Sequence, residues 1–127
     1  MSDFGSVIYS YTRSQAIADG FLIDISKISK EAGFRIPVAV SDNLYHRILN
    51  PNQSLKDQGQ SLEGRIWDML TMLRLSIKTR QNSSRLAFKV LFIMIPEKRP
   101  SSITIILTIS PGDNGEPAMT LFLPEDD

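Results

Sequence analysis

The chain has 127 residues, 42% of them hydrophobic, and its 14 Lys and Arg residues balance its 14 Asp and Glu residues. This size and composition are typical of one globular domain, so we expect residues 1–127 to form a single domain without a strong general attraction to nucleic acid or membrane. With no cysteine and a single histidine, the sequence excludes disulfides, thiolate nucleophiles and metal sites built from Cys or from clustered His.

Capping residues near the amino terminus predict two short helices. The first is expected over residues 10–20, because Thr12 is a suitable N-cap and the segment ends in glycine. The second begins at Asp24 or Ser26 and ends before Gly33.

An extended segment, a third helix and a loop are expected next. Residues 36–40 contain a proline, and a residue before proline avoids the helical region, which favours an extended backbone. A third short helix is predicted from Ser41 to Leu49. Residues 51–60 are rich in Asn, Gln, Asp and Gly, so they are expected to form an exposed loop.

The longest predicted helix starts after Ser61, which is its expected N-cap, and continues to about Arg80. At about 100° per residue, a narrow apolar stripe runs along it and Met69 widens that stripe. The stripe consists of Ile66, Leu70, Leu73 and Ile77. Such a stripe indicates a helix that packs on a core by one side only.

Three strands are predicted in the last third of the chain, separated by turns rich in Pro and Gly. Residues 85–95 alternate and become apolar on both sides, which predicts a strand buried on both faces at its far end. Residues 102–110 alternate between Ile or Leu and mostly Thr, which predicts a half-buried strand, and residues 118–123 form the third.

The order of these elements predicts an α+β fold. N-terminal short helices and one long helix are expected to pack on a C-terminal three-stranded antiparallel meander. The sheet residues expected to meet the apolar stripe are Phe88, Val90, Ile105 and Leu107.

Charge is segregated along the chain. Residues 65–99 carry eight Lys and Arg against two acids, whereas residues 100–127 carry five acids and no base.

Helical spacing brings four residues of the basic segment to one side of the long helix, near Arg65. These four are Trp67, Thr71, Arg74 and Lys78.

This group of Trp67, Arg74, Lys78 and Arg65 is the candidate partner-binding site. Trp with Arg is typical of a protein-interface hot spot, and an aromatic side chain with cations also suits stacked bases and phosphates. In the alternative interpretation, Trp67 packs at the edge of the core and the aliphatic stems of Arg74 and Lys78 cover it.

Other polar residues give no catalytic or metal site. His46 lacks a nearby nucleophile motif and is interpreted as a surface or boundary histidine rather than a base. Residues 113–116 contain Asp, Asn and Glu beside a glycine but lack calcium-loop spacing, so a hairpin turn is expected. The acidic carboxyl terminus is expected to be frayed and solvated rather than a mimic of nucleic acid. We therefore predict no enzyme activity, catalytic residue, metal or cofactor.

Several segments resemble a family of small uncharacterised proteins encoded on bacterial plasmids, phages and integrative elements. The resemblance extends over nearly the whole chain and is weakest at residues 81–100. It is carried by residues 11–20 (YTRSQAIADG), 22–26 (LIDIS), 31–34 (EAGF), 37–40 (PVAV), 64–70 (GRIWDML), 112–113 (GD), 116–117 (EP) and 123–126 (LPED). The resemblance implies an accessory protein of a mobile element and no catalytic residues.

The predicted function is that of a non-enzymatic binding protein of a bacterial mobile element, an inhibitor or accessory factor that covers the surface of a host or element protein. The alternative is a nucleic-acid-binding accessory protein that uses the basic stretch 65–99. The sequence shows neither a signal peptide nor an apolar run long enough to span a membrane, so a cytoplasmic protein without membrane contact is expected.

Overall fold

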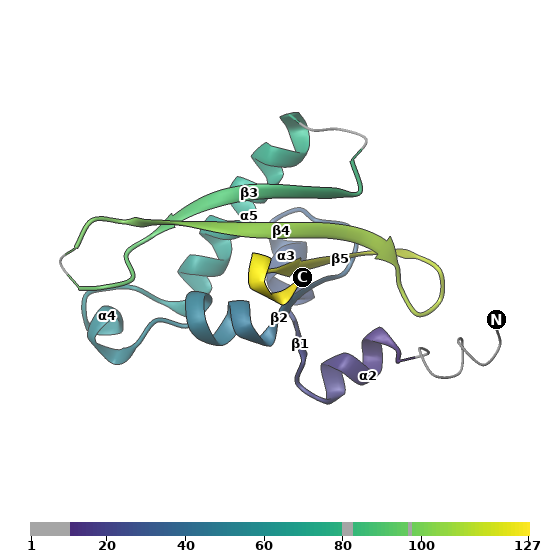
Figure 1. Cartoon of the computed structure of the whole chain (residues 1–127), viewed down its shortest axis with the longest axis horizontal. Helices are drawn as coiled ribbons and strands as arrows, with labels where there is room; N and C mark the ends of the chain where they lie inside the picture. Colours follow the sequence, from purple (N-terminus) through teal and green to yellow (C-terminus); the bar gives the residue numbers. More distant parts are fainter. Residues whose placement is uncertain (1–10, 80–82, 97) are drawn as a thin grey trace.

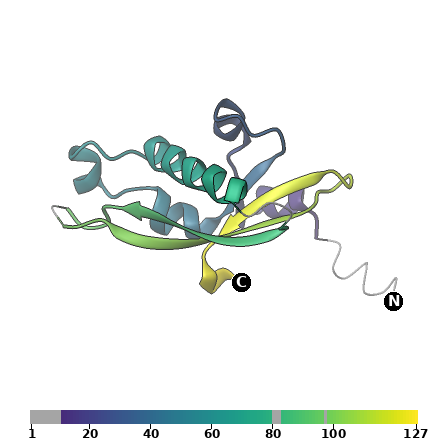
Figure 2. The same cartoon turned by 90° about the horizontal axis from the view of Figure 1, so that it is seen from above.

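The computed structural model describes residues 11–79, 83–96 and 98–127. The predicted start of the first helix at Ser10, the end of the long helix at Arg80, and Glu97 in the predicted turn at 96–100 lie outside these residues. One sheet runs through the molecule, and the long helix α5 (Leu62–Thr79) crosses one face of it (Figure 1). Figure 2 shows α5 and the carboxyl-terminal turn η2 (Pro124–Asp126) on opposite sides of the sheet.

Within the described residues, the sheet has five strands in the order β1-β2-β5-β4-β3. They are β1 (Leu22–Asp24), β2 (Val38–Ser41), β3 (Arg85–Phe92), β4 (Ser101–Pro111) and β5 (Pro117–Phe122). The strands β3, β4 and β5 pair antiparallel in chain order, whereas β2 pairs parallel with β5 and antiparallel with β1. The α+β class is confirmed, but the predicted three-stranded antiparallel sheet is wrong, because two short amino-terminal strands extend it into a mixed sheet.

Strand β3 follows strict alternation, with every second residue buried from Leu86 to Phe92. The prediction that both faces are buried at its far end is wrong, because the side chain of Leu91 is 64% exposed. The face that contains Leu86 packs on α5, while Leu91 lies on the opposite face, away from that helix. The prediction that residues 102–110 form a half-buried strand is confirmed by β4, in which Ile105 and Leu107 are fully buried.

Local capping is observed at Thr12 and Ser61, the two N-caps that the sequence predicts. In α2 (Arg13–Ala18), the Thr12 hydroxyl accepts a hydrogen bond from the Gln15 backbone N–H at 3.0 Å. In α5, the Ser61 hydroxyl accepts from the Gly64 N–H at 2.9 Å. Each cap satisfies an N–H that the first helical turn leaves without a partner.

The second short helix is α3 (Ser26–Glu31), in the predicted region. The third is a π-helix, η1 (Leu44–Leu49), which begins later than expected because Ser41 is the last residue of β2. The Ser41 hydroxyl still accepts from the Leu44 N–H at 3.1 Å, so the predicted first residue of this helix bonds to the first residue of η1 from its position in β2.

Residues 51–60 are mostly exposed, as predicted, but the prediction that they form a loop is wrong. This segment contains a short helix, α4 (Gln53–Asp57), in which the Asn52 side chain accepts from the Leu55 N–H at 3.0 Å. Leu55 is only 2% exposed. One buried apolar side chain, together with an N-terminal cap, stabilises a helical turn in an otherwise polar segment.

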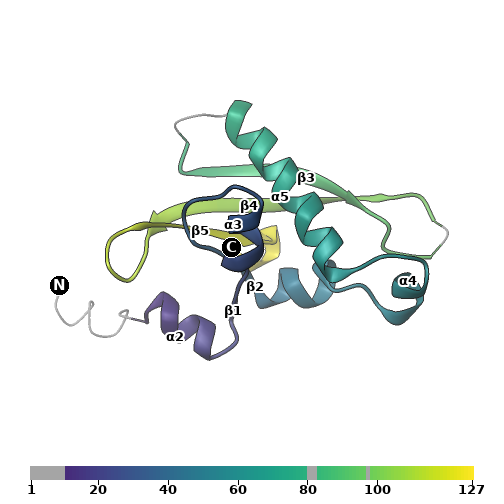
Figure 3. The ribbon, with the colours of Figure 1, turned by 180° about the vertical axis from the view of Figure 1, so that it is seen from behind.

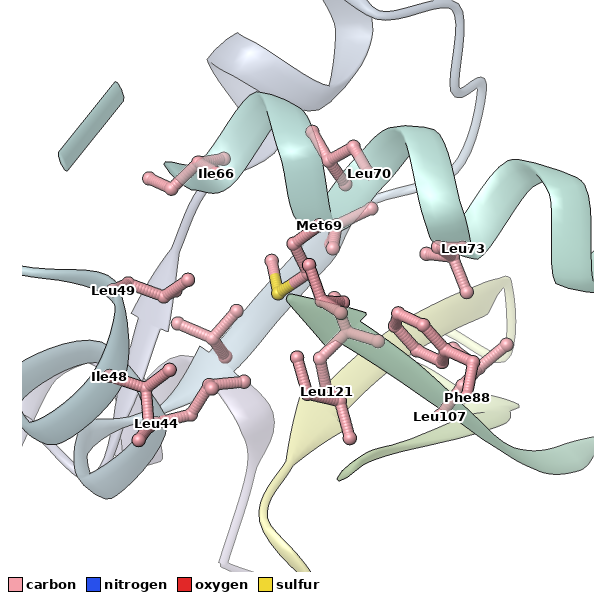
Figure 4. Close-up of a cluster of buried hydrophobic side chains, with 14 of the residues drawn as sticks. Leu44, Ile48, Leu49, Ile66, Met69, Leu70, Leu73, Phe88, Leu107 and Leu121 are labelled. Atoms are coloured by element: carbon pink, nitrogen blue, oxygen red, sulfur yellow. The ribbon is translucent and has the colours of Figure 1, made fainter. Parts of the chain in front are cut away.

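The core lies between α5, η1 and the sheet (Figure 4). Ile66, Leu70 and Leu73 are at most 1% exposed, and Ile77 packs against the same cluster while partly exposed. The predicted stripe and the predicted sheet residues belong to this one cluster, which confirms their packing. The sheet side of the cluster includes Phe88, Val90, Ile105 and Leu107.

The carboxyl terminus is folded onto the sheet, so the prediction of a frayed end is wrong. The Asp126 carboxylate accepts hydrogen bonds from the Ser41 hydroxyl at 2.7 Å and from the Asn43 side-chain amide at 2.8 Å. Glu125 forms an ion pair with Arg47 at 2.8 Å. These bonds join η2 to the region between β2 and η1, which lies far away in the sequence.

Asp126→Asn is expected to make stability less dependent on acid pH. Partial burial acts against ionisation of Asp126, but hydrogen bonds from Asn43, Ser41 and the Leu123 N–H outweigh it and lower the pKa of this carboxyl. A carboxyl with a lowered folded-state pKa stabilises the fold above its unfolded pKa of about 4, and that contribution disappears as pH falls through the folded-state value.

Urea unfolding at several pH values measures this effect. The wild type should lose more stability than Asp126→Asn as the pH falls below about 4, and the variant should be the less stable protein near neutrality. Asp68→Asn removes the same charge from an exposed position of α5 and is the matched control for the loss of one carboxylate. Parallel curves for wild type and Asp126→Asn would show that this carboxylate does not stabilise the fold.

Candidate functional site

The predicted group of Trp67, Thr71, Arg74 and Lys78 lies along one side of α5, beside the buried stripe. Thr71, Arg74 and Lys78 are exposed and Trp67 is partly buried. The Thr71 hydroxyl donates to the Trp67 carbonyl at 2.8 Å, so Thr71 is bonded to its own helix. Trp67, Arg74 and Lys78 share this side of α5, because Lys78 follows Arg74 by one turn and Trp67 precedes Arg74 by two turns.

Helix α3 and the loop that follows it flank this side of α5. Figure 3 shows α3 on the same face of the sheet as α5, and the two helices are in contact. Ile28 of α3 and Leu62 of α5 line one open depression of about 520 Å³. Along α5, Trp67 comes after Leu62, which lines that depression, and before Arg74, which meets the loop.

Arg74 is fixed by the loop after α3. Its Nη2 donates to the Ala32 carbonyl, and its guanidinium lies 5.7 Å from the centre of the Phe34 ring. Gly33, between them, has a φ of 97°, and a Cβ at this position would clash with Nη2 of Arg74. The backbone conformation therefore favours glycine here, and a side chain at this position would displace the guanidinium of Arg74.

Two more cations surround the same loop. Lys30 and Arg35 are exposed and, together with Phe34, line an open depression of about 620 Å³. We name the combined area the α3–α5 surface. It consists of Lys30, Phe34, Arg35, Trp67, Arg74 and Lys78.

This arrangement provides four cations and two aromatic side chains on one side of the molecule. The position of Trp67, Arg74 and Lys78 was available from helical spacing. Lys30, Phe34 and Arg35 were missed as site residues, because only the packing of α3 against α5 brings them to Arg74. The one local signal was Gly33, which sequence reasoning used only as the end of a helix.

Arg65 is not part of this surface. Its side chain is 2% exposed and points into the protein, where Nη1 donates to the Ile48 carbonyl and Nη2 to the Ile93 carbonyl, each at 2.5 Å. Its guanidinium lies 5.4 Å from the centre of the Phe92 ring, and burial lowers its pKa. Arg65 lies four residues before the buried Met69, and this spacing places it on the inward side of α5.

The basic stretch 65–99 does not form one surface in the described residues. Arg74 and Lys78 lie on α5, on one side of the sheet. Arg85 is ion-paired with Asp127, beside η2 on the other side. With Arg65 buried as well, the basic residues of this stretch point in at least three directions.

Two other polar candidates from the sequence, His46 and the turn at residues 113–116, contact neighbouring parts of the fold. His46 is exposed, and its ring lies edge-on to Tyr45 with the centroids 5.0 Å apart. The expected hairpin turn is confirmed between β4 and β5, with Gly115 at a φ of 86°. Asp113 in that turn accepts from the hydroxyl and N–H of Ser14 and from the Arg13 N–H, and these bonds lower the pKa of Asp113. Its carboxylate thus binds the start of α2.

Comparison with known proteins identifies a family for the chain but no function. Residues 2–127 match the family described as "Family of unknown function (DUF6573)". No curated protein and no solved structure matches the chain. Within the described residues, every helix is too short or too polar to cross a membrane.

Proposed function

The chain belongs to DUF6573, a family of unknown function, and from its own surface we propose that it is a non-enzymatic binding protein whose α3–α5 surface covers part of a partner protein. The observation that carries the proposal is the fixed position of Arg74 against Phe34 and Ala32. An arginine that is already held in place loses little side-chain entropy when a partner binds. Trp67, two turns earlier on the same side of α5, supplies the second residue type that dominates interface hot spots.

The charge of this surface favours an acidic partner. Lys30, Arg35 and Lys78 are exposed and take part in neither of the two ion pairs formed among the described residues. Such cations direct the approach and orientation of a partner with the opposite potential. The partner would present carboxylates at the rim and a flat or apolar group against Trp67 and Phe34.

The setting that we propose is a bacterial mobile element, on the basis of the sequence resemblance described above. In that setting the protein would inhibit or assist a host or element protein by occluding its surface. The alternative, nucleic-acid binding through residues 65–99, has less support, because the basic residues of that stretch are divided between the two sides of the sheet and the interior.

Charge reversal tests the α3–α5 surface. The double variant Arg74→Glu, Lys78→Glu should bind its partner at least about tenfold more weakly, because it replaces two cations with two carboxylates facing an acidic surface. The partner is first captured from the bacterial host and identified by mass spectrometry, and affinity is then measured by calorimetry. Circular dichroism checks that the helix and sheet content is retained.

The matched control is Lys98→Glu, Arg99→Glu, which makes the same change in net charge on exposed residues of the β3–β4 connection. It should leave the affinity near the wild-type value. Equal loss in both double variants would show a general charge effect and contradict the proposed surface. Salt titration separates the two functions, since binding to nucleic acid weakens steeply as salt is added and a hot-spot interface does not.

A further inference from the structure

Strand β3 is at the edge of the sheet and pairs only with β4 among the described residues. The Ile109 N–H donates to the Ser84 carbonyl at 2.8 Å, which identifies Ser84 and Ile109 as a hydrogen-bonded pair of the antiparallel ladder. Such pairs alternate along the ladder. Leu86, Phe88 and Val90 therefore direct their backbone groups toward β4, and the odd-numbered residues of β3 direct theirs to the open edge.

Four residues of β3 have backbone N–H and C=O groups on the open side. Arg85 is satisfied locally, because the Ser83 hydroxyl donates to its carbonyl and accepts from its N–H. Ala87, Lys89 and Leu91 remain. Within the described residues, no hydrogen bond engages the backbone groups that these three residues direct to the edge. A row of donors and acceptors at strand spacing is complementary to another extended backbone.

The two sides of this edge differ in chemistry. On the outer face of the sheet, Lys89 is exposed and takes part in neither ion pair of the described chain. On the inner face, α5 overhangs the edge, and Figures 1 and 3 show its carboxyl-terminal end projecting past β3. Arg65, which bonds to Ile93 just after β3, marks the side of α5 that faces this strand. Met72 lies two turns further along that side and is 37% exposed.

We propose that the free edge of β3 binds an extended segment of a partner protein as a sixth strand. The segment carries acidic side chains on the face that meets Lys89 and apolar side chains on the face beneath Met72. Backbone hydrogen bonds to Ala87, Lys89 and Leu91 supply affinity, and the alternating side chains supply specificity. This site is separate from the α3–α5 surface and does not depend on the function proposed for it.

Charge disfavours a second copy of this chain as the occupant. An antiparallel pair of β3 strands centred on Ala87, Phe88 or Lys89 uses most of the strand. In each of these registers, Lys89 of one copy lies near a cation of the other copy. It is directly opposite Arg85 when the pair is centred on Ala87, diagonal to Arg85 and Lys89 when it is centred on Phe88, and directly opposite Lys89 when it is centred on Lys89. Like charges in these positions destabilise strand pairing, whereas an acidic segment turns the same positions into attractive pairs.

A synthetic peptide of about nine residues that alternates Glu with Val is the probe, and its matched control has Lys in place of Glu. Fluorescence anisotropy should show the Glu peptide binding the wild-type protein at least about tenfold more tightly than the Lys peptide. Methylation of the peptide's alternate backbone nitrogens on the side facing β3 should abolish binding. Equal binding of the two peptides, or no binding of the Glu peptide, would overturn the proposal.

Two variants test the protein side. Ala87→Pro removes an N–H that points to the open edge and leaves the ladder to β4 intact, a position at which edge strands tolerate proline. It should abolish peptide binding and retain the wild-type circular dichroism spectrum. Lys89→Glu changes only a side chain and should reverse the preference in favour of the Lys peptide, so it decides the question even if the proline variant does not fold.

Sedimentation of the free protein tests the other occupant. The wild type should remain a monomer at the concentrations used for peptide binding. A dimer that Ala87→Pro dissociates would show that a second copy occupies the edge and would overturn the acidic-segment proposal.

Discussion

Leu70→Ala is expected to lower the free energy of unfolding by about 2 to 5 kcal/mol. Leu70 is 1% exposed and lies at the centre of the stripe by which α5 packs on the sheet (Figure 4). Truncation removes apolar contacts with the surrounding cluster and leaves a cavity that a close-packed interior fills only in part. Urea unfolding followed by circular dichroism measures the change.

Leu75→Ala is the matched control for this prediction. Leu75 lies on the same helix but is 51% exposed, so the same truncation should cost less than about 1 kcal/mol. Similar losses for the two variants would mean that the packing of α5 on the sheet does not hold the fold together.

Arg65→Met is expected to lower the free energy of unfolding by about 2 to 4 kcal/mol, because it keeps the length of the side chain but removes its donors. Without the guanidinium, the carbonyls of Ile48 and Ile93 lose their hydrogen bonds in a region that holds the end of η1 beside the end of β3. An acceptor left without a partner in the interior costs more than the bond itself contributes. Thermal and urea unfolding of the variant measure the loss.

Arg65→Lys separates charge from geometry. Lysine keeps the positive charge, but a single ammonium group does not reproduce the two-pronged contact of the guanidinium, so only part of the stability should return. Lys78→Met is the control on the exposed side of α5 and should cost about 1 kcal/mol or less. A variant Arg65→Met as stable as the wild type would show that both carbonyls find other donors.

Local interactions made much of this fold predictable. Thr12 and Ser61 were recognised as caps, because an N-cap needs only a side-chain oxygen and a backbone N–H a few residues away. The stripe containing Leu70 was recognised because the period of a helix repeats within one segment of the chain. Strands β3, β4 and β5 were identified by alternation and turn residues for the same reason.

The candidate site was only half visible in the sequence. The strip of Trp67, Arg74 and Lys78 follows from helical spacing alone. Its other half, with Lys30 and Phe34, comes from a segment about forty residues earlier, and no local pattern relates the two. The direction of Arg65 was misjudged although the spacing to Met69 pointed inward, because a charged residue was assumed to be exposed.

The sequence by itself determined the α+β class, the long amphipathic helix and the order of the carboxyl-terminal strands, because these depend on periodicity and turns within short segments. The tertiary structure alone decided the parallel pairing of β2 with β5, the burial of Arg65 and the docking of Asp126 on Ser41. Each of these depends on backbone or side-chain partners far away in the chain. Such a partner becomes available only when the folded chain brings the two segments together and excludes the water that would otherwise satisfy their polar groups.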